Sequence, residues 1–191
     1  DMHIRHAREV IRSGIGRAGL AMLAVLAVIA LAGPLLSPDP ARESTATLRP
    51  PSENHPLGTN DVGQDVWARL ASGARTSMVV AVGAGLLSTL LSTLVGISAG
   101  LAGGLYDRIT MRLVDALLVI PGLVLLILLA AFVQPGLYGL IVLISVLHWQ
   151  GGARVLRAQT LSLKERPHVL ASRSFGAGPG HVALRHIVPD L

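Results

Sequence analysis

The sequence predicts an all-α membrane protein that crosses the bilayer several times. Its 191 residues are 51% hydrophobic and only 14% charged, and the mean hydropathy is +0.60. A water-soluble domain carries about 25% charged residues, so lipid must be a principal solvent for this chain. The apolar residues are also gathered into four long runs, each of the kind that forms a transmembrane helix.

The first apolar run extends from Ala18 to Leu36, and arginines precede it. It is long for a signal peptide and no cleavage site follows it, so an uncleaved transmembrane helix over 18–37 is expected. Residues 1–17 then form its basic flank. Residues 38–76 are polar and rich in proline, which favours a segment outside the membrane. Within that segment we expect a short helix from Val66 to Gly73.

Three further runs make up a helical core over 77–153. The run from Ser77 to Leu105 contains no charged residue, and at about 1.5 Å per residue it can cross a hydrocarbon core of about 30 Å. The next extends from Met111 to Val133, and the last from Leu137 to Trp149, with a continuation to Val155 left open. Residues 154–191 are basic and amphipathic, and no run there is long enough to span.

The distribution of basic residues predicts the orientation. If the spans alternate, one side holds Arg5, Arg8, Arg12, Arg17, Arg108, Arg112, Arg154, Arg157, Lys164, Arg166, Arg173 and Arg185. The other side holds Arg42, Arg49, Arg69 and Arg75. Because cytoplasmic loops carry the excess of Lys and Arg, the N-terminus and residues 154–191 are expected in the cytoplasm and residues 38–76 outside it.

Small residues recur at every fourth position of the second run: Ala84, Ser88, Ser92, Gly96, Gly100 and Gly104. They place one face of the helix close to another backbone. We take Ser92, Gly96, Gly100 and Gly104 as helix-packing candidates, either in static packing or in an interface that slides during transport.

Two residues of the third run are candidates for gating. Pro121 frees the carbonyl of Leu117 and kinks the helix, as a static kink or a hinge. Asp115 is an ionisable residue inside a span, which suggests function, although an ion pair with Arg112 three residues earlier is the favoured interpretation.

The composition argues against several other classes of protein. Without cysteine there is no disulfide framework and no thiolate zinc site, and the scattered histidines predict no metal centre. No Walker A motif occurs, so the chain is not expected to be an enzyme that hydrolyses nucleotides. The basic pI of about 11.0 could indicate a nucleic-acid partner, but aromatic residues make up only 3% and leave little for base stacking.

The tail carries a specific resemblance. Residues 167–191 read PHVLASRSFGAGPGHVALRHIVPDL, which resembles the E-A-A loop of inner-membrane permease subunits of binding-protein-dependent ABC importers. Leu170, Ala171 and Ser172 occupy the E-A-A positions, Gly176 the motif glycine, and Val188-Pro189 the closing pair. Leu170 therefore stands where the family has glutamate, and Ser172 where it has the second alanine.

Two upstream segments resemble the peptide and nickel branch of the same family. HPLGTNDVGQDVWARLASGARTS, from His55 to Ser77, is similar to its HPLGT segment, and YDRITMRLVDALLVIP, from Tyr106 to Pro121, to its second hallmark. RHIVP, from Arg185 to Pro189, is similar to its RHILP. Together these motifs imply the transmembrane domain of a type I ABC importer. Because family members continue for about two more spans, we expect a chain truncated at its C-terminus.

The resemblance implies a bacterial inner-membrane permease that imports peptides, nickel or metal chelates by alternating access. Its implied partners are a second permease, two cytoplasmic ATPase subunits that bind ATP and Mg, a periplasmic or lipid-anchored binding protein, and lipid; this chain itself binds no cofactor. The residues implied in ATPase coupling are Leu170, Ala171, Ser172, Phe175, Gly176, His186 and Pro189. Gly176 is expected to adopt a left-handed turn, and Phe175 either anchors a partner or folds onto the membrane surface. The rival function, a secondary transporter of a small solute, needs intramembrane coupling groups, for which Asp115 alone qualifies.

Overall fold

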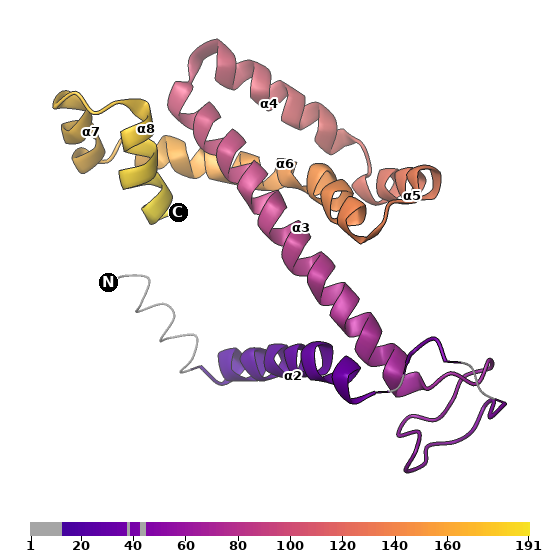
Figure 1. The fold of residues 1–191 in the computed structure, drawn as a ribbon. Helices are drawn as coiled ribbons and strands as arrows, with labels where there is room; N and C mark the ends of the chain where they lie inside the picture. The colour runs from indigo at the N-terminus through magenta and orange to yellow at the C-terminus, as the bar shows by residue number, and fades with distance from the viewer. Residues whose placement is uncertain (1–12, 38, 43–44) are drawn as a thin grey trace. The chain divides into compact units, whose positions relative to one another are not determined.

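The computed structural model describes residues 13–37, 39–42 and 45–191, and within them the regular elements are all helices, without a β-strand (Figure 1). The expected flank with Arg5, Arg8 and Arg12 lies outside the described residues. The chain divides into two compact units, Asp1–Val79 and Val80–Leu191. All the candidate residues of the tail and of the predicted gate fall in the second unit.

In the first unit, α2 (Gly14–Leu36) begins at Ser13, whose hydroxyl accepts a hydrogen bond from the Gly16 amide at 3.0 Å. Its last turns lie against the start of α3 (Val66–Ala102) at a glycine. A Cβ added to Gly33 would lie 2.6 Å from the Cβ of Ala71, which is fully buried. Close approach of the two helices therefore depends on Gly33.

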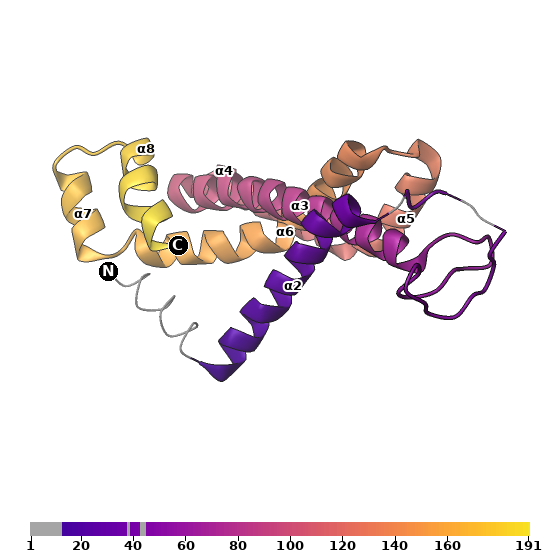
Figure 2. The ribbon, with the colours of Figure 1, turned by 60° about the horizontal axis from the view of Figure 1, so that its bottom comes forward.

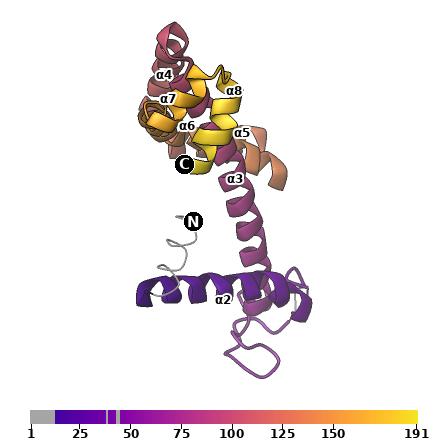
Figure 3. The same cartoon turned by 90° about the vertical axis from the view of Figure 1, so that its left-hand side faces the viewer.

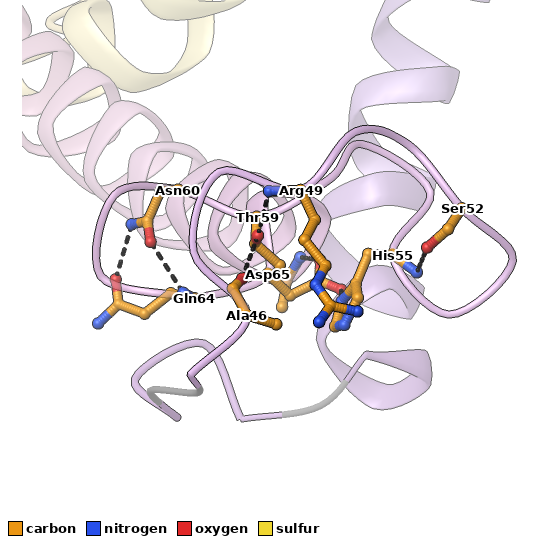
Figure 4. A network of polar contacts seen from close by, with 9 residues as sticks. Ala46, Arg49, Ser52, His55, Thr59, Asn60, Gln64 and Asp65 are labelled. Atoms are coloured by element: carbon orange, nitrogen blue, oxygen red, sulfur yellow. Dashed lines mark hydrogen bonds and ion pairs between the residues drawn. The ribbon is translucent and has the colours of Figure 1, made fainter.

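Before α3 the chain folds into a loop held by hydrogen bonds (Figure 4). Thr59 donates its hydroxyl to the Ala46 carbonyl at 2.5 Å and accepts the Arg49 amide at 3.0 Å. The Nδ1 atom of His55 lies 2.8 Å from Oδ2 of Asp65. The other oxygen of Asp65 accepts the Ala68 amide at 3.0 Å, which caps the first turn of α3.

Helix α3 is continuous over 37 residues, so the prediction of a separate short helix over 66–73 is wrong. No proline interrupts residues 73–77, and the Thr76 hydroxyl donates back to the Ser72 carbonyl at 3.1 Å, a bond that a helix accommodates. The helix ends at Ala102 because Gly103 and Gly104 have φ angles of +64° and +58° and reverse the chain. Residues 106–112, which lie at the junction of the second and third apolar runs, therefore belong to the next helix.

The third apolar run is broken into α4 (Gly104–Val119) and α5 (Gly122–Val133), which are bent by 77°. The kink expected at Pro121 is thus present as a sharp break. The carbonyl of Leu117 does not go unpaired, because it accepts the Ile120 amide at 3.3 Å. A tighter turn at the end of α4 replaces the hydrogen bond that proline cannot donate.

Helix α6 (Leu137–Leu163) lies along α4 and α5 (Figure 2). It continues well past the expected end near Val155, so residues 154–163, about a quarter of the predicted cytoplasmic tail, prolong a membrane helix. The remainder of the tail forms α7 (Pro167–Ser174), α8 (Pro179–Val182), a π-helical turn η1 (Ala183–Ile187) and a 3₁₀ turn η2 (Val188–Asp190) (Figure 3).

By length and composition, α2, α3 and α6 can each cross a membrane, and the bent pair of α4 and α5 makes a fourth candidate. The tail is tied to two of these helices by a small apolar core. Its members are Ile97 of α3, Leu163 of α6, Val169 of α7, Val182 of α8 and Ile187 of η1. The short elements of the tail are therefore packed on the ends of α3 and α6.

Candidate functional site

Helix α7 carries the three residues at the E-A-A positions. It begins at Pro167, whose fixed φ suits the first turn of a helix, and it has only eight residues. A helix of this length does not persist alone in water, so packing must hold it. Val169 supplies that contact, because it is fully buried in the core described above, whereas Leu170 is 44% exposed. The helix thus has an inner face anchored on α3 and α6 and an outer face open to solvent.

A left-handed turn ends α7, as the sequence predicted. Gly176 has a φ of +86°, and its amide donates to the Arg173 carbonyl at 2.9 Å. The amide of Ala177 donates to the Ser172 carbonyl at 3.1 Å, and this pattern of hydrogen bonds terminates helices. An added Cβ at Gly176 would meet no atom within 4 Å, so the backbone angle, and not lack of space, selects glycine.

Phe175 lies immediately before this turn and is 92% exposed. It borders a surface hollow of about 490 Å³ together with Ser172, Gly176 and His181. No part of the described chain covers the ring. The turn therefore presents a large aromatic side chain beside an open depression.

The far end of the tail returns to α7. The Nε2 atom of His186 lies 3.1 Å from the Ser172 hydroxyl, and its ring centroid is 5.9 Å from that of His181. Pro189 belongs to η2, where the neighbouring Asp190 carboxylate accepts a hydrogen bond from Arg166 at 3.4 Å. Leu170, Ala171, Ser172, Phe175, Gly176, His186 and Pro189, separated by up to 19 positions, are thereby brought into one folded element. Among the described residues, no three His, Asp or Glu side chains are arranged to hold a metal ion.

The small-residue face of α3 lies against α6. The Ser92 hydroxyl donates to the Trp149 carbonyl at 2.7 Å. An added Cβ would lie 2.6 Å from the Ala153 carbonyl oxygen at Gly96 and 2.8 Å from the Thr160 side chain at Gly100. The helices therefore approach closely enough to exclude even a methyl group.

Gly104 does not belong to this face, contrary to the expectation from its four-residue spacing. It is the first residue of α4, after the chain has reversed, and an added Cβ there would meet no atom within 4 Å. The spacing extends to Gly104 in the sequence, but the helix ends at Ala102. The stripe therefore stops at Gly100.

Asp115 forms an ion pair, but with Arg154 of α6 and not with Arg112 of its own helix. Both partners are more than half exposed, at 57% for Asp115 and 55% for Arg154. The three-residue spacing from Arg112 made a local pair plausible, but α6 offers a second cation along the same edge of α4. The pair joins the two helices and leaves Asp115 accessible.

A second ion pair on this edge was not expected from the sequence. Asp107 at the start of α4 accepts two hydrogen bonds from Arg157 of α6. About two turns beyond Arg157, at the residue that caps the end of α6, Lys164 donates to the Gly100 carbonyl at 3.2 Å. Because Asp107 and Arg157 are 50 positions apart, no local spacing indicates the pair. Both residues do, however, lie just beyond a charge-free run, and that shared position is the signal that could have suggested it.

Comparison with known proteins gives a consistent result. A family model described as the inner membrane component of binding-protein-dependent transport systems matches residues 92–191. The chain is 38% identical over 185 residues to the dipeptide transport system permease protein DppC of Bacillus subtilis, covering 96% of this chain and 58% of that protein. It is 37% identical over 188 residues to a putative peptide permease protein of Brucella abortus, covering 97% and 62%.

A third relative, the oligopeptide transport system permease protein OppC of Bacillus subtilis, is 34% identical over 176 residues, covering 90% of this chain and 57% of that protein. The chain thus spans about three fifths of the length of the curated relatives it matches.

Proposed function

Because this chain belongs to the family of binding-protein-dependent transport system inner membrane components, we propose that it is the membrane-spanning permease subunit of an ATP-driven peptide importer. Three relatives are named as permeases for dipeptides, peptides or oligopeptides, which supports peptides as the transported class. Nickel and metal chelates, which the motifs also imply, form the competing class. ATP and Mg would bind to partner ATPase subunits, so this chain would perform no chemistry.

We propose that α7 and the turn at Gly176 receive the motion of a cytoplasmic ATPase. The observation that carries this proposal is the two-sided placement of α7. Its inner residue Val169 is buried against α3 and α6, and the turn that follows exposes Phe175 beside an open hollow. A partner that binds Phe175 could therefore displace the ends of α3 and α6 through the contact that Val169 makes with them. Lone aromatic side chains seated in pockets commonly dominate such interfaces.

The accompanying topology is proposed from the positive-inside rule. Residues 1–17 and 154–191 would lie in the cytoplasm of a bacterium and residues 38–76 outside its inner membrane. A second homologous permease would complete the translocation path, two ATPase subunits would drive it, and an exported binding protein would deliver the peptide. Secondary transport is disfavoured, because Asp115, its single candidate coupling group, is already paired with Arg154.

The test asks whether substitutions at this turn uncouple the permease from its ATPase. Phe175→Ala removes the exposed ring, and Gly176→Val places a β-branched residue at a φ of +86°, which is strained for any side chain with a Cβ. Both variants should insert normally while ATPase co-purification and peptide-stimulated ATP hydrolysis fall. Tyr138→Ala, which removes another aromatic side chain that is 80% exposed, is the control. Wild-type uptake of labelled peptide by both tail variants would refute the proposal.

A further inference from the structure

A second hollow, of about 430 Å³, lies along α4. Arg108 and Arg112 border it with Gly104 and Met111. The two arginines are four positions apart on one helix, so their side chains lie on the same face one turn apart. Both are exposed, and among the described residues neither forms an ion pair.

The hollow carries a net positive charge. Asp107 and Asp115 also line it, but their carboxylates are neutralised by Arg157 and Arg154 of α6. Within the part of the chain that the structure describes, no acidic side chain pairs with the guanidinium groups of Arg108 and Arg112. Two uncompensated cations therefore face the same depression.

The hollow lies at the border between apolar and charged sequence. No charged residue occurs from Thr76 to Tyr106 or from Leu137 to Ala153. The ends of these two stretches meet in space, because Asp107 pairs with Arg157. In a membrane, such a border lies at the level of the lipid headgroups.

An apolar stripe accompanies the two arginines along α4. Leu105, Ile109 and Leu113 are 67%, 62% and 58% exposed and also recur at four-residue spacing. They occupy the face next to Arg108 and Arg112, so cations and apolar side chains run side by side. This is the pattern expected of a surface that meets a molecule with an anionic head and a hydrocarbon body.

We propose that this hollow binds an anionic phospholipid. Its phosphate accepts hydrogen bonds from Arg108 and Arg112, and an acyl chain lies along Leu105, Ile109 and Leu113. Guanidinium groups suit this role because their planar donors match phosphate oxygens. Basic pockets at the cytoplasmic ends of membrane helices are known to select anionic headgroups.

The test measures lipid binding to the full protein, purified with its co-purifying subunits in phosphatidylcholine nanodiscs. Phosphatidylglycerol is titrated in and bound lipid is counted by native mass spectrometry. Arg108→Gln with Arg112→Gln should weaken phosphatidylglycerol binding by about 30-fold, from about 1 kcal/mol per cation. Arg173→Gln with Arg185→Gln, which removes equal charge from exposed arginines of the tail, should leave it unchanged. Arg108→Lys with Arg112→Lys should retain most of the binding and show that the fold tolerates changes at these positions.

Three results would overturn the proposal. The first is unchanged phosphatidylglycerol affinity in the double Gln variant. The second is displacement of the lipid by inorganic phosphate, which would make the hollow a site for a free anion. The third comes from photocrosslinking in cells with Met111→p-benzoylphenylalanine. Capture of a protein segment would mean that the face is a protein interface, whereas capture of phospholipid supports the proposal.

Discussion

Asp107 of α4 and Arg157 of α6 form a paired contact in which Nε donates to Oδ1 and Nη2 to Oδ2, each at 2.5 Å. The side chains are 13% and 30% exposed, so the pair is better shielded from water than the neighbouring pair of Asp115 and Arg154. It joins the first turn of α4 to the helix that leads into α7. A displacement of α7 would therefore be transmitted to the start of the bent α4–α5 segment.

This difference in exposure predicts unequal costs for two identical substitutions. Asp107→Asn leaves a partly buried guanidinium without its acid and should lower the free energy of unfolding by about 1–3 kcal/mol, below the full cost for a buried pair. Asp115→Asn, in an exposed pair, should cost about 0–1 kcal/mol. Thermal unfolding in detergent compares the two. Equal shifts in Tm would mean that burial does not distinguish these pairs.

A second prediction concerns two glycines of α3. Gly96→Ala would place a methyl group 2.6 Å from the backbone oxygen of Ala153, and backbone cannot move aside cheaply, so α3 and α6 should separate and stability should fall. Gly85→Ala meets no atom within 4 Å and should be neutral or stabilising by up to about 1 kcal/mol, since alanine is the better helix former. The measurements are the Tm and, separately, the yield of a cysteine crosslink between α3 and α6. Tolerance of Gly96→Ala would contradict the close helix contact.

A third prediction concerns pH and the loop before α3. Burial raises the pKa of Asp65, but hydrogen bonds from His55 and from the Ala68 and Trp67 amides outweigh it, and the pKa lies below its usual range. A carboxyl with a folded pKa below its unfolded one stabilises the fold above the unfolded pKa, and that contribution is lost as the pH falls through the folded pKa. Hydrogen exchange over residues 45–65 should therefore stay slow down to about pH 4 and accelerate below it.

The matched substitutions isolate Asp65 in that experiment. Asp65→Asn should accelerate exchange at neutral pH and flatten its response to acid. Asp61→Asn changes an exposed carboxyl of the same loop and should preserve the wild-type profile. An unaltered profile in the Asp65 variant would show that the carboxylate does not hold the loop.

A fourth prediction addresses the missing acid of the E-A-A motif. Leu170 is 44% exposed near the N-terminus of α7, where a negative charge interacts favourably with the helix dipole by about 0.3–1 kcal/mol. Leu170→Glu should therefore tighten ATPase association up to about fivefold. Leu170→Gln supplies polarity without charge and should not. Equal ATPase affinity in all three proteins would mean that this position has no electrostatic role in docking.

A fifth prediction tests the orientation. Ser52 lies in the segment proposed to be external and Ser162 in the last turn of α6, and both are exposed. With an impermeant thiol reagent on intact cells, Ser52→Cys should be labelled and Ser162→Cys should not until the cells are opened. The reverse pattern would invert the topology.

Features that depend on neighbouring residues alone could be predicted from the sequence. The charge-free run after Ser77 must leave water, Pro121 must break a helix, and Gly176 follows α7 in a left-handed turn, because each effect is set by side-chain polarity or by one backbone angle. The same local reasoning failed where two local signals competed. Gly104 continues a small-residue spacing, but the adjacent glycines end the helix first.

Only the tertiary structure decided which distant residues meet. It paired Asp115 with Arg154, 39 positions away, and Asp107 with Arg157, and it placed Gly96 against Ala153. It also gathered His186 and Ser172 into the folded tail. Each of these contacts depends on how α6 lies against α3 and α4, and many side chains together set that packing. The local sequence around either partner does not specify that packing.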